Sequence, residues 1–333
     1  MTELSTLSFE ELIARLSEPA DTLILFHRGP DADAVGSAFA LRQVLEGLGS
    51  RAFCVCQDEL PQRLRFLAHE MQESVLPEAI PEELEVTRII SVDSASPSQL
   101  GTLYPLYEGK IDLMIDHHGM GEPYADHYIR PDLAATGEIM FDLVKELATA
   151  GQLTITEPLC VDLYAAISSD TGGFRFANVT SETHMRAAEL LASGLDAAAI
   201  NHRLFVAKTM EQLRAQAAGI SNLQVYHDGR VGIVTFPYAL KVALGLQDEH
   251  LETLVDIARS LAGVQVAISI RQPNAEPVFR VSARATEDYD VASLCAIFGG
   301  GGHKRAAGCT ISAADMDEAV RKLVNAIDFS KHS

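Results

Sequence analysis

An apolar run at residues 111–115 ends abruptly in one carboxylate and two imidazoles, those of Asp116, His117 and His118. A short apolar run is typical of a buried strand in an open parallel sheet, and such sheets place their chemistry just past the carboxyl ends of the strands. Carboxylate oxygens and imidazole nitrogens are common ligands of divalent cations. The sequence therefore predicts a metal site at the end of this strand.

Three other apolar segments are followed by side chains of the same types. They are residues 22–26 before His27, Asp31 and Asp33, residues 88–92 before Asp93, and residues 163–167 before Asp170. Each aspartate taken singly could be the N-cap of a helix, because Asp is a common cap between a strand and a helix. Capping explains the whole set poorly, since three histidines belong to it. We expect these carboxylates and imidazoles to converge on one cleft.

The same stretches carry the motifs of a known family, in the order in which that family has them. The motifs are His27-Arg-Gly-Pro-Asp31-Ala-Asp33, Val92-Asp93-Ser, Asp116-His117-His118, Ser169-Asp170-Thr-Gly-Gly-Phe and Gly299-Gly-Gly-Gly-His303-Lys-Arg-Ala-Ala-Gly308. Over its whole length the chain resembles the DHH superfamily of phosphoesterases, and within it the compact DHH–DHHA1 proteins of the bifunctional oligoribonuclease (nanoRNase) and pAp phosphatase type, NrnA. Ala32 departs from the first motif, where many relatives carry glycine.

The resemblance implies a centre of two divalent cations. It assigns His27 and Asp31 to one ion, Asp33, His117 and Asp170 to the other, and Asp93 to both. Oxygen and imidazole ligands without a thiolate suit Mn²⁺, with Mg²⁺, Co²⁺ or Fe²⁺ as alternatives. Two ions bridged by one carboxylate would lie about 3.5–4 Å apart, a separation at which a shared hydroxide can attack phosphorus in line.

The two other polar residues of the Asp-His-His motif are expected to assist catalysis. His118 would contact the scissile phosphate or help the leaving oxygen to depart. The alternative for His118 is a surface histidine at a strand end. We expect Asp116 to orient His117 rather than to bind metal, in the manner of carboxylates that lie behind a metal ligand.

A run of four glycines, residues 299–302, is the other unusual stretch. Backbone N–H groups in such a run could approach a phosphate or a base that side chains would block, and a flexible turn is the alternative. By resemblance this is the substrate-binding loop of a DHHA1 domain, whose candidate ligand-holding residues are Ser282, Arg284, Gly300, Gly301, Gly302 and His303. Residues 271–305 hold five Lys and Arg against four Asp and Glu, which makes this stretch relatively cationic.

The composition limits the substrates and the location. A net charge of −20 leaves too few cations for a track along a long nucleic acid. We therefore expect short oligoribonucleotides, pAp (adenosine 3′,5′-bisphosphate) or cyclic and linear dinucleotides as partners, and no long duplex. No run of about 18 apolar residues could span a bilayer, and the N-terminus lacks a signal pattern, so we expect a cytoplasmic protein without membrane contact. Five cysteines without zinc-type spacing are expected to be reduced and mostly buried. A homodimer stays open.

The order of elements predicts an α/β fold with two domains. In the first half, strands are predicted at 22–27, 51–56, 88–92, 111–115 and 127–130, and helices at 34–48, 136–150, 157–168 and 180–193. This alternation favours a doubly wound, mostly parallel sheet. In the second half, a hairpin around Asp228-Gly229, a helix at 251–261, strands at 264–271 and 278–284 and a helix at 314–327 predict a smaller α/β domain. The expected boundaries are 1–194 for the catalytic DHH domain, 195–220 for a helical connector and 221–333 for the substrate-binding DHHA1 domain.

These features together predict a hydrolase that cleaves phosphate esters of short nucleotides in a cleft between its domains. The expected activities are removal of the 3′-phosphate of pAp and cleavage of short oligoribonucleotides to 5′-monophosphates. A phosphodiesterase for cyclic di-AMP or pApA is the alternative, because the motifs do not separate these substrates. An inorganic pyrophosphatase and a non-catalytic nucleotide-binding module are more distant alternatives.

Overall fold

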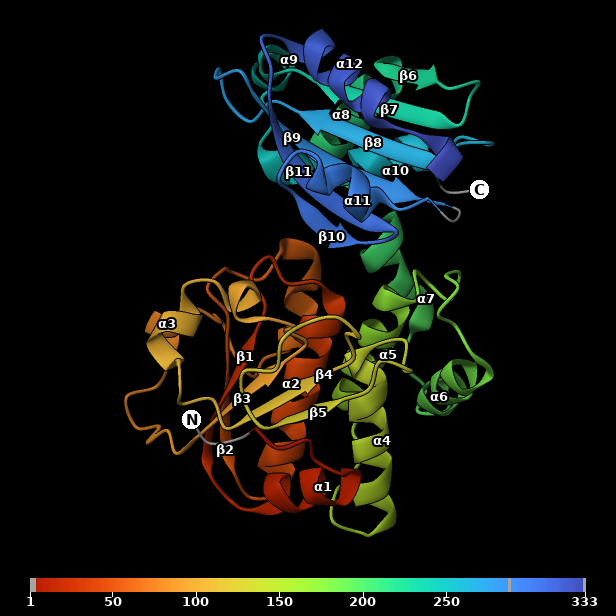
Figure 1. Cartoon of the computed structure of the whole chain (residues 1–333). Coiled ribbons are helices and arrows are strands. Elements are labelled where there is room, and N and C mark those ends of the chain that lie inside the picture. Colours follow the sequence, from red (N-terminus) through yellow and green to blue (C-terminus); the bar gives the residue numbers. More distant parts are fainter. Residues whose placement is uncertain (1–3, 287–288, 332–333) are drawn as a thin grey trace. The chain divides into compact units, whose positions relative to one another are not determined.

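The computed structural model describes residues 4–286 and 289–331 and falls into two compact units, Met1–Ala207 and Lys208–Ser333 (Figure 1). Each unit contains its own sheet and its own hydrophobic clusters. The α/β class predicted from the sequence is confirmed.

A five-stranded, all-parallel sheet with the strand order β2-β1-β3-β4-β5 forms the centre of the first unit. The strands are β1 (Asp21–Phe26), β2 (Arg51–Val55), β3 (Arg88–Val92), β4 (Leu113–Asp116) and β5 (His127–Ile129). The strands β1, β3 and β4 are almost wholly buried, which explains why their sequences are continuous apolar runs rather than alternating ones. Because Phe26 pairs with Val92, and Val92 with Ile115, the carboxyl ends of β1, β3 and β4 lie side by side.

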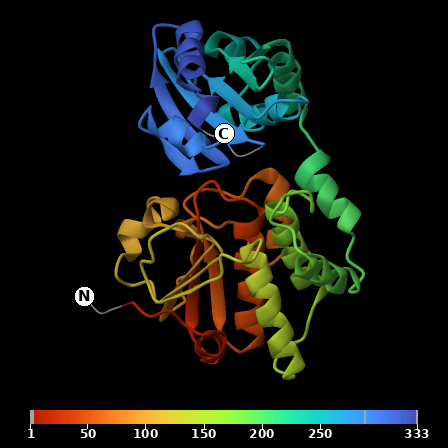
Figure 2. The ribbon, with the colours of Figure 1, turned by 45° about the vertical axis from the view of Figure 1, so that its right-hand side comes forward.

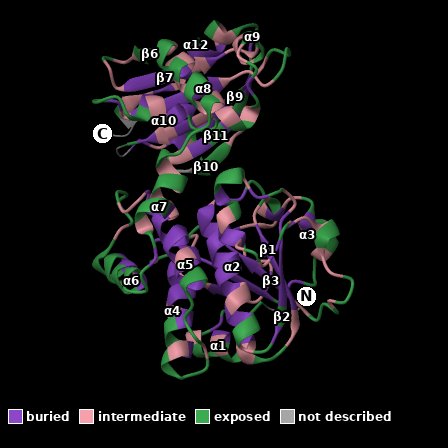
Figure 3. Ribbon diagram, turned by 180° about the vertical axis from the view of Figure 1, so that it is seen from behind, coloured by how far each residue is buried: buried purple, intermediate pink, exposed green. Residues whose placement is uncertain are grey.

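Helices cover both faces of this sheet, as Figures 1 and 2 show. On one face lie α1 (Phe9–Ser17), α2 (Ala32–Gly47), α4 (Thr136–Thr149) and α5 (Glu157–Asp170), and on the other lies the short α3 (Leu103–Tyr107). Seen from behind in Figure 3, α2 and α5 are largely buried. They approach closely, because a Cβ at Gly36 would lie 2.5 Å from the carbonyl oxygen of Asp162. The doubly wound arrangement is thus confirmed.

The stretch between the two sheets differs from the continuous helical pattern of the sequence. After α6 (Ser181–Leu191) and α7 (Ala197–Asn201), the chain makes a π-helical turn at His202–Val206 and then starts a new helix, α8 (Met210–Ser221). A capping box at Thr209 explains the new start, because its side chain and that of the residue at N3 bond the free N–H groups of the first turn. Helix α8 packs on the second sheet through the buried Ala215. The boundaries expected at 194 and 220 stay a prediction.

The second unit contains a six-stranded mixed sheet in the order β10-β11-β9-β8-β7-β6. Its strands are β6 (Leu223–Tyr226), β7 (Val231–Phe236), β8 (Val266–Arg271), β9 (Val278–Ala285), β10 (Gly301–His303) and β11 (Ala306–Ser312). Its helices are α8, α9 (Tyr238–Ala243), α10 (Leu254–Arg259), α11 (Val291–Ala296) and α12 (Met316–Ala326). The predicted hairpin at Asp228-Gly229 is confirmed, since β6 and β7 pair antiparallel and both residues have positive φ.

Two strands of the second unit do not follow from the sequence pattern. The strands β10 and β11 consist mainly of glycine and alanine at the ends where they pair, and these residues have low strand propensity. The extended conformation of β11 is stabilised by pairing rather than by intrinsic strand propensity, because β11 is hydrogen-bonded along its whole length to β9.

Two expectations from composition can be compared with the structure. All five cysteines are free and buried, as expected for reduced thiols. Among the described residues, none of the helices combines the length and the apolar character that crossing a bilayer requires.

Candidate metal centre

Six ligand-type side chains meet at the carboxyl edge of the first sheet. His27, Asp93 and His117 directly follow β1, β3 and β4, Asp31 caps α2, Asp33 lies in the first turn of α2, and Asp170 is the last residue of α5. The structure thus brings together all the residues that the resemblance assigns to metal. They form two groups in which one ligand atom from each residue lies within 4.8 Å of the others.

The first group consists of His27, Asp31 and Asp93. The Nε2 atom of His27 lies 3.7 Å from Oδ1 of Asp31 and 3.7 Å from Oδ2 of Asp93. The other ring nitrogen, Nδ1, lies 2.9 Å from the carbonyl oxygen of Arg28. Because a carbonyl only accepts hydrogen bonds, Nδ1 carries a proton, and this leaves the Nε2 lone pair of the neutral ring directed at the carboxylates. That is the tautomer a metal ligand requires.

The second group consists of Asp33, His117 and Asp170. The Nε2 atom of His117 lies 3.8 Å from Asp33, 3.8 Å from Asp93 and 3.3 Å from Asp170. Nδ1 lies 3.3 Å from the carbonyl oxygen of Leu133, which fixes the tautomer in the same way. His117 Nε2 is buried and has no partner with hydrogen-bond geometry. A buried nitrogen that faces three carboxylates in this way fits a cation.

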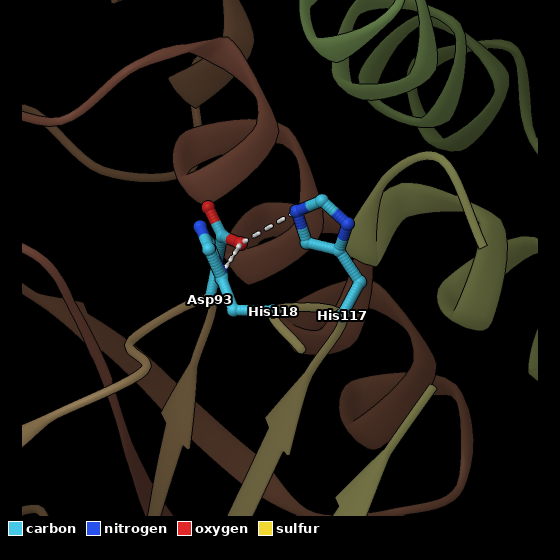
Figure 4. Close-up of side chains that lie close together, drawn as sticks. All are labelled: Asp93, His117 and His118. Atoms are coloured by element: carbon cyan, nitrogen blue, oxygen red, sulfur yellow. Dashed lines mark ion pairs between the residues drawn. The ribbon is translucent and has the colours of Figure 1, made fainter. Parts of the chain in front are cut away.

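Asp93 connects the two groups. Its Oδ2 faces His27 and its Oδ1 faces His117, so that one carboxylate presents an oxygen to each group. The residue is 2% exposed, and its backbone has a φ of +53°. A positive φ is uncommon for a residue other than glycine and often marks a functional position. Figure 4 shows the imidazoles of His117 and His118 beside this carboxylate.

The charges of the cluster favour a cation. Burial, together with the neighbouring Asp93, raises the pKa of Asp33 well above its usual value, and burial raises that of Asp93 to about 7. Burial alone would lower the pKa of the imidazoles, but the nearby carboxylates outweigh it and raise the pKa to about 9 for His27 and about 10 for His117. Asp170 ends α5, where the helix dipole disfavours a negative charge. Divalent cations would neutralise these carboxylates.

Asp116 orients a different histidine from the one expected. Its Oδ1 accepts hydrogen bonds from the backbone N–H groups of His117 (2.7 Å) and His118 (3.1 Å) and lies 2.7 Å from Nδ1 of the His118 ring. The His117 ring is held instead by the carbonyl of Leu133. The two backbone bonds turn the Asp116 carboxylate back toward its own loop, where the His118 ring is within reach. Burial lowers the pKa of His118, but Asp116 and Asp93 more than compensate and raise it.

The residues that form hydrogen bonds to the ligands from outside the cluster do not follow from the sequence pattern. Leu133, Thr136, Gly137 and Asn178 bond to ligand side chains or to a ligand's backbone. Thr136 is the first residue of a helix that was predicted from the sequence. Its contacts to the ligands depend on the path of the chain between β5 and α4, and the hydrophobic periodicity of the sequence does not predict that path.

The predicted substrate-binding residues lie in the second unit, and two of them line a hollow of about 420 Å³. Its lining consists of Arg271, Arg280, Val281, Ser282, Phe298, Gly299, Gly300, Gly308, Cys309 and Thr310. Ser282 and Gly300 are thus at the hollow. Arg284 lies on the same face of β9 but outside the lining, and its Nη1 donates to the carbonyl of Ala283 at 3.0 Å. Arg271 and Arg280 are cations of the lining that the resemblance does not single out.

Close packing gives the glycine run a second explanation. A Cβ at Gly300 would lie 2.2 Å from the carbonyl oxygen of Gly308, and one at Gly302 would lie 2.5 Å from that of Ala306. These two glycines therefore let β10 approach β11. Gly301 has open space at the same position. The backbone of His303 ends β10, and its side chain lies outside what the structure describes.

Comparison with known proteins adds the following findings. Residues 21–167 match the DHH family, N-terminal domain, and residues 236–328 match the DHHA1 domain. The chain is 31% identical over 305 residues to the bifunctional oligoribonuclease and PAP phosphatase NrnA of Thermus thermophilus, covering 91% of this chain and 88% of that protein. It is 24% identical to the cyclic-di-AMP phosphodiesterase PdeA of Listeria monocytogenes, covering 96% of this chain and 49% of that protein. An exopolyphosphatase-related protein of Bacteroides fragilis has a similar fold, with a TM-score of 0.87, 22% identity and coverage of 98% and 97%.

Proposed function

Because the chain belongs to the DHH family, whose members are metal-dependent phosphoesterases, we propose that it hydrolyses short nucleotides with two bound divalent cations. Its substrates would be pAp, from which it removes the 3′-phosphate, and oligoribonucleotides of a few residues, which it cleaves to 5′-monophosphates. The name of the Thermus relative, and the match over nearly the full length of both chains, support this choice.

The distances around Asp93 carry the proposal. With its Oδ2 3.7 Å from His27 and its Oδ1 3.8 Å from His117, this carboxylate would be shared by two ions. His27 and Asp31 would complete one site, and Asp33, His117 and Asp170 the other. We propose Mn²⁺, because all six residues offer oxygen or imidazole nitrogen and none offers sulfur. Bound cations would supply Lewis acidity and a water molecule of lowered pKa.

The chain's own catalytic contribution would come from His118. Burial alone would lower the pKa of this ring, but Asp116 and Asp93 outweigh burial and raise it, which favours the protonated form. A protonated imidazole at this position would donate a hydrogen bond to the scissile phosphate or a proton to the leaving oxygen. Asp116 would keep the ring in place through its 2.7 Å contact with Nδ1.

The second unit would bind the rest of the nucleotide. A phosphate or a base would be held by Ser282 and Gly300, at the hollow, and by Arg284, on the same face of β9. Gly301 and Gly302 of the glycine run and His303, which follows it, would assist. Arg271 and Arg280 add two cations to the hollow, and burial lowers the pKa of Arg271. An anionic group would relieve the desolvation of such an arginine.

A Mn²⁺-dependent hydrolysis assay tests this function. The substrates would be pAp, a short oligoribonucleotide, pApA, cyclic di-AMP and pyrophosphate, each at equal concentration, with the Asp93→Ala variant as the control for contaminating nucleases. We expect pAp and the oligoribonucleotide to have the highest kcat/KM. Hydrolysis of pyrophosphate alone, or equal activity of the variant, would contradict the proposal.

The second candidate function is hydrolysis of cyclic di-AMP or pApA. The Listeria relative favours it, because that cyclic-di-AMP phosphodiesterase matches almost the whole of this chain. The identity is lower, and the match covers only about half of that protein. A higher kcat/KM for cyclic di-AMP than for pAp in the same assay would establish this second function instead.

A further inference from the structure

A segment of five residues before and at the start of α4, Leu133–Gly137, contacts the proposed metal ligands from behind. The carbonyl of Leu133 accepts a hydrogen bond from His117 Nδ1 at 3.3 Å. The N–H groups of Thr136 and Gly137 donate to the two oxygens of Asp33, at 2.7 and 2.8 Å. The hydroxyl of Thr136 donates to Asp93 Oδ1 at 2.9 Å. Asn178 extends the set, because its Nδ2 donates to the carbonyls of both Ala134 and Asp170.

The contacts to Asp33 and to Asp93 differ in kind. Asp33 accepts two backbone N–H groups and the hydroxyl of Ser37, so its orientation depends mainly on the main chain. Within residues 4–286 and 289–331, the hydroxyl of Thr136 is the one hydrogen-bond donor to the carboxylate of Asp93. The imidazoles of His27, His117 and His118 lie 3.7–3.8 Å from the oxygens of Asp93, beyond hydrogen-bond distance. Among the described residues, Thr136 therefore supplies the one hydrogen bond that can fix the rotation of this shared carboxylate.

We infer that Thr136 is a positioning residue, whose hydroxyl fixes the rotation of the Asp93 carboxylate and thereby sets the affinity of the centre for its pair of cations. This inference rests on the proposed two-cation function. The hydrogen bond directs one oxygen of Asp93 toward His117 and leaves the other directed at His27. Residues that orient a metal ligand commonly change metal affinity by about 10–100-fold when they are replaced.

The hydroxyl has no other structural task in the described part of the chain. Thr136 is fully buried at the first helical position, and the N-cap of α4 is Ala135, so the hydroxyl does not cap the helix. The absence of a side chain at Gly137 allows the segment to lie close to α5, because a Cβ at this position would lie 2.5 Å from the Cβ of Ala166. The segment is fastened by Glu138, whose carboxylate accepts the N–H of Ala134 at 2.8 Å. The scaffold thus exists without the hydroxyl of Thr136.

The Thr136→Val variant tests the inference, because valine keeps the shape of threonine and replaces the hydroxyl, the hydrogen-bond donor, with a methyl group. Mn²⁺ affinity and stoichiometry are measured by isothermal titration calorimetry on the full chain, and kcat and KM for pAp are measured at saturating Mn²⁺. We expect affinity to fall by about 10–100-fold, with KM changing little. Thr136→Ser should recover affinity to within about threefold, since serine keeps the donor. Thr149→Val, on an exposed position of the same helix, is the matched control and should bind as the wild type does.

The possible results are distinguishable. If Thr136→Val folds, as circular dichroism shows, and binds Mn²⁺ as tightly as the wild type, the inference is wrong. Equal losses for the valine and serine variants would also overturn it, because they would indicate packing rather than hydrogen bonding. If valine prevents folding, Thr136→Ala removes the hydroxyl without adding a methyl group beside Asp93 and is judged by the same affinities. A wild type that binds Mn²⁺ but hydrolyses neither pAp nor oligoribonucleotides would contradict the proposed substrates and leave the role of Thr136 standing.

Discussion

Asp93 belongs to both groups of candidate metal ligands, since its Oδ2 faces the imidazole of His27 and its Oδ1 faces that of His117. We predict that Asp93→Ala reduces activity more than replacement of any other ligand, to less than about a tenth of wild type at saturating Mn²⁺. Metal analysis should show that both cations are lost. Asp31→Ala provides the comparison, because Asp31 belongs to one group alone and its loss should spare the second cation.

The outcome that contradicts the shared-ligand assignment is simple to recognise. If Asp93→Ala loses one cation and Asp31→Ala loses the same one, Asp93 serves a single site. Activity of the Asp93 variant above a tenth of wild type would point the same way.

A second prediction at this scale concerns protons. In the cation-free protein the pKa is about 9 for His27 and about 10 for His117, so both rings are protonated at pH 7. A cation must displace these protons, and binding therefore weakens as pH falls and strengthens as pH rises, until the dependence flattens above about pH 9–10. Calorimetry at pH 7 in buffers of different protonation enthalpy should detect the release of at least about two protons per chain, because the raised pKa values of Asp33 and Asp93 add to the release from the two rings. A Mn²⁺ affinity that stays the same between about pH 6 and pH 9, where the affinity should still be rising, would contradict the predicted proton release.

At the scale of elements, the hairpin of β10 and β11 separates two roles of glycine. A Cβ at Gly300 would lie 2.2 Å from the carbonyl oxygen of Gly308, whereas one at Gly301 would meet nothing within 4 Å. We predict that Gly300→Ala lowers the free energy of unfolding by about 1–3 kcal/mol through overpacking, and that Gly301→Ala changes it by less than about 1 kcal/mol. Urea denaturation monitored by circular dichroism measures both.

The same pair of variants tests the binding role of the glycine run. If its backbone approaches the substrate, Gly301→Ala should raise KM for pAp without loss of stability, because its methyl group would project into open space. An unchanged KM for the Gly301 variant would limit the run to packing.

The strands that are followed directly by ligand residues could be predicted from the sequence, whereas the paths of the connecting segments could not. Apolar runs locate β1, β3 and β4, and parallel pairing then brings the residues after them to one edge, which is why His27, Asp93 and His117 could be named in advance. The partner of Asp116 depends on side-chain directions in a short loop. Thr136 becomes a neighbour of Asp93 only through the path from β5 to α4. Neither leaves a periodic signal in the sequence.

The strands β10 and β11 are the corresponding limit in the second unit. Their Gly and Ala residues lack intrinsic strand preference, and pairing with β9 imposes the extended conformation. The break before α8 does have a local signal, the capping box of Thr209 and Gln212, but an uninterrupted run of helix-forming residues conceals it.

At the scale of the whole molecule, we expect the net charge to limit the length of the substrate. The chain has 46 Asp and Glu against 26 Lys and Arg, for a net charge of −20. The cations of the hollow in the second unit, Arg271 and Arg280, are local and continue into no extended basic sequence. A long polyanion would therefore gain little from counterion release and would be repelled by the remaining surface.

We accordingly predict that kcat/KM falls as oligoribonucleotides lengthen from two residues to beyond about five. Each additional phosphate would meet an acidic surface, so the decline should be steepest at low salt and should lessen as ionic strength rises and screens the repulsion. A 5′-labelled series at fixed Mn²⁺, measured at two salt concentrations, provides the values. The longest probe would be a 24-mer, about five times the length of about five residues beyond which we expect the decline. If a dinucleotide and this 24-mer have comparable kcat/KM, the protein must have a binding track for long strands despite its charge.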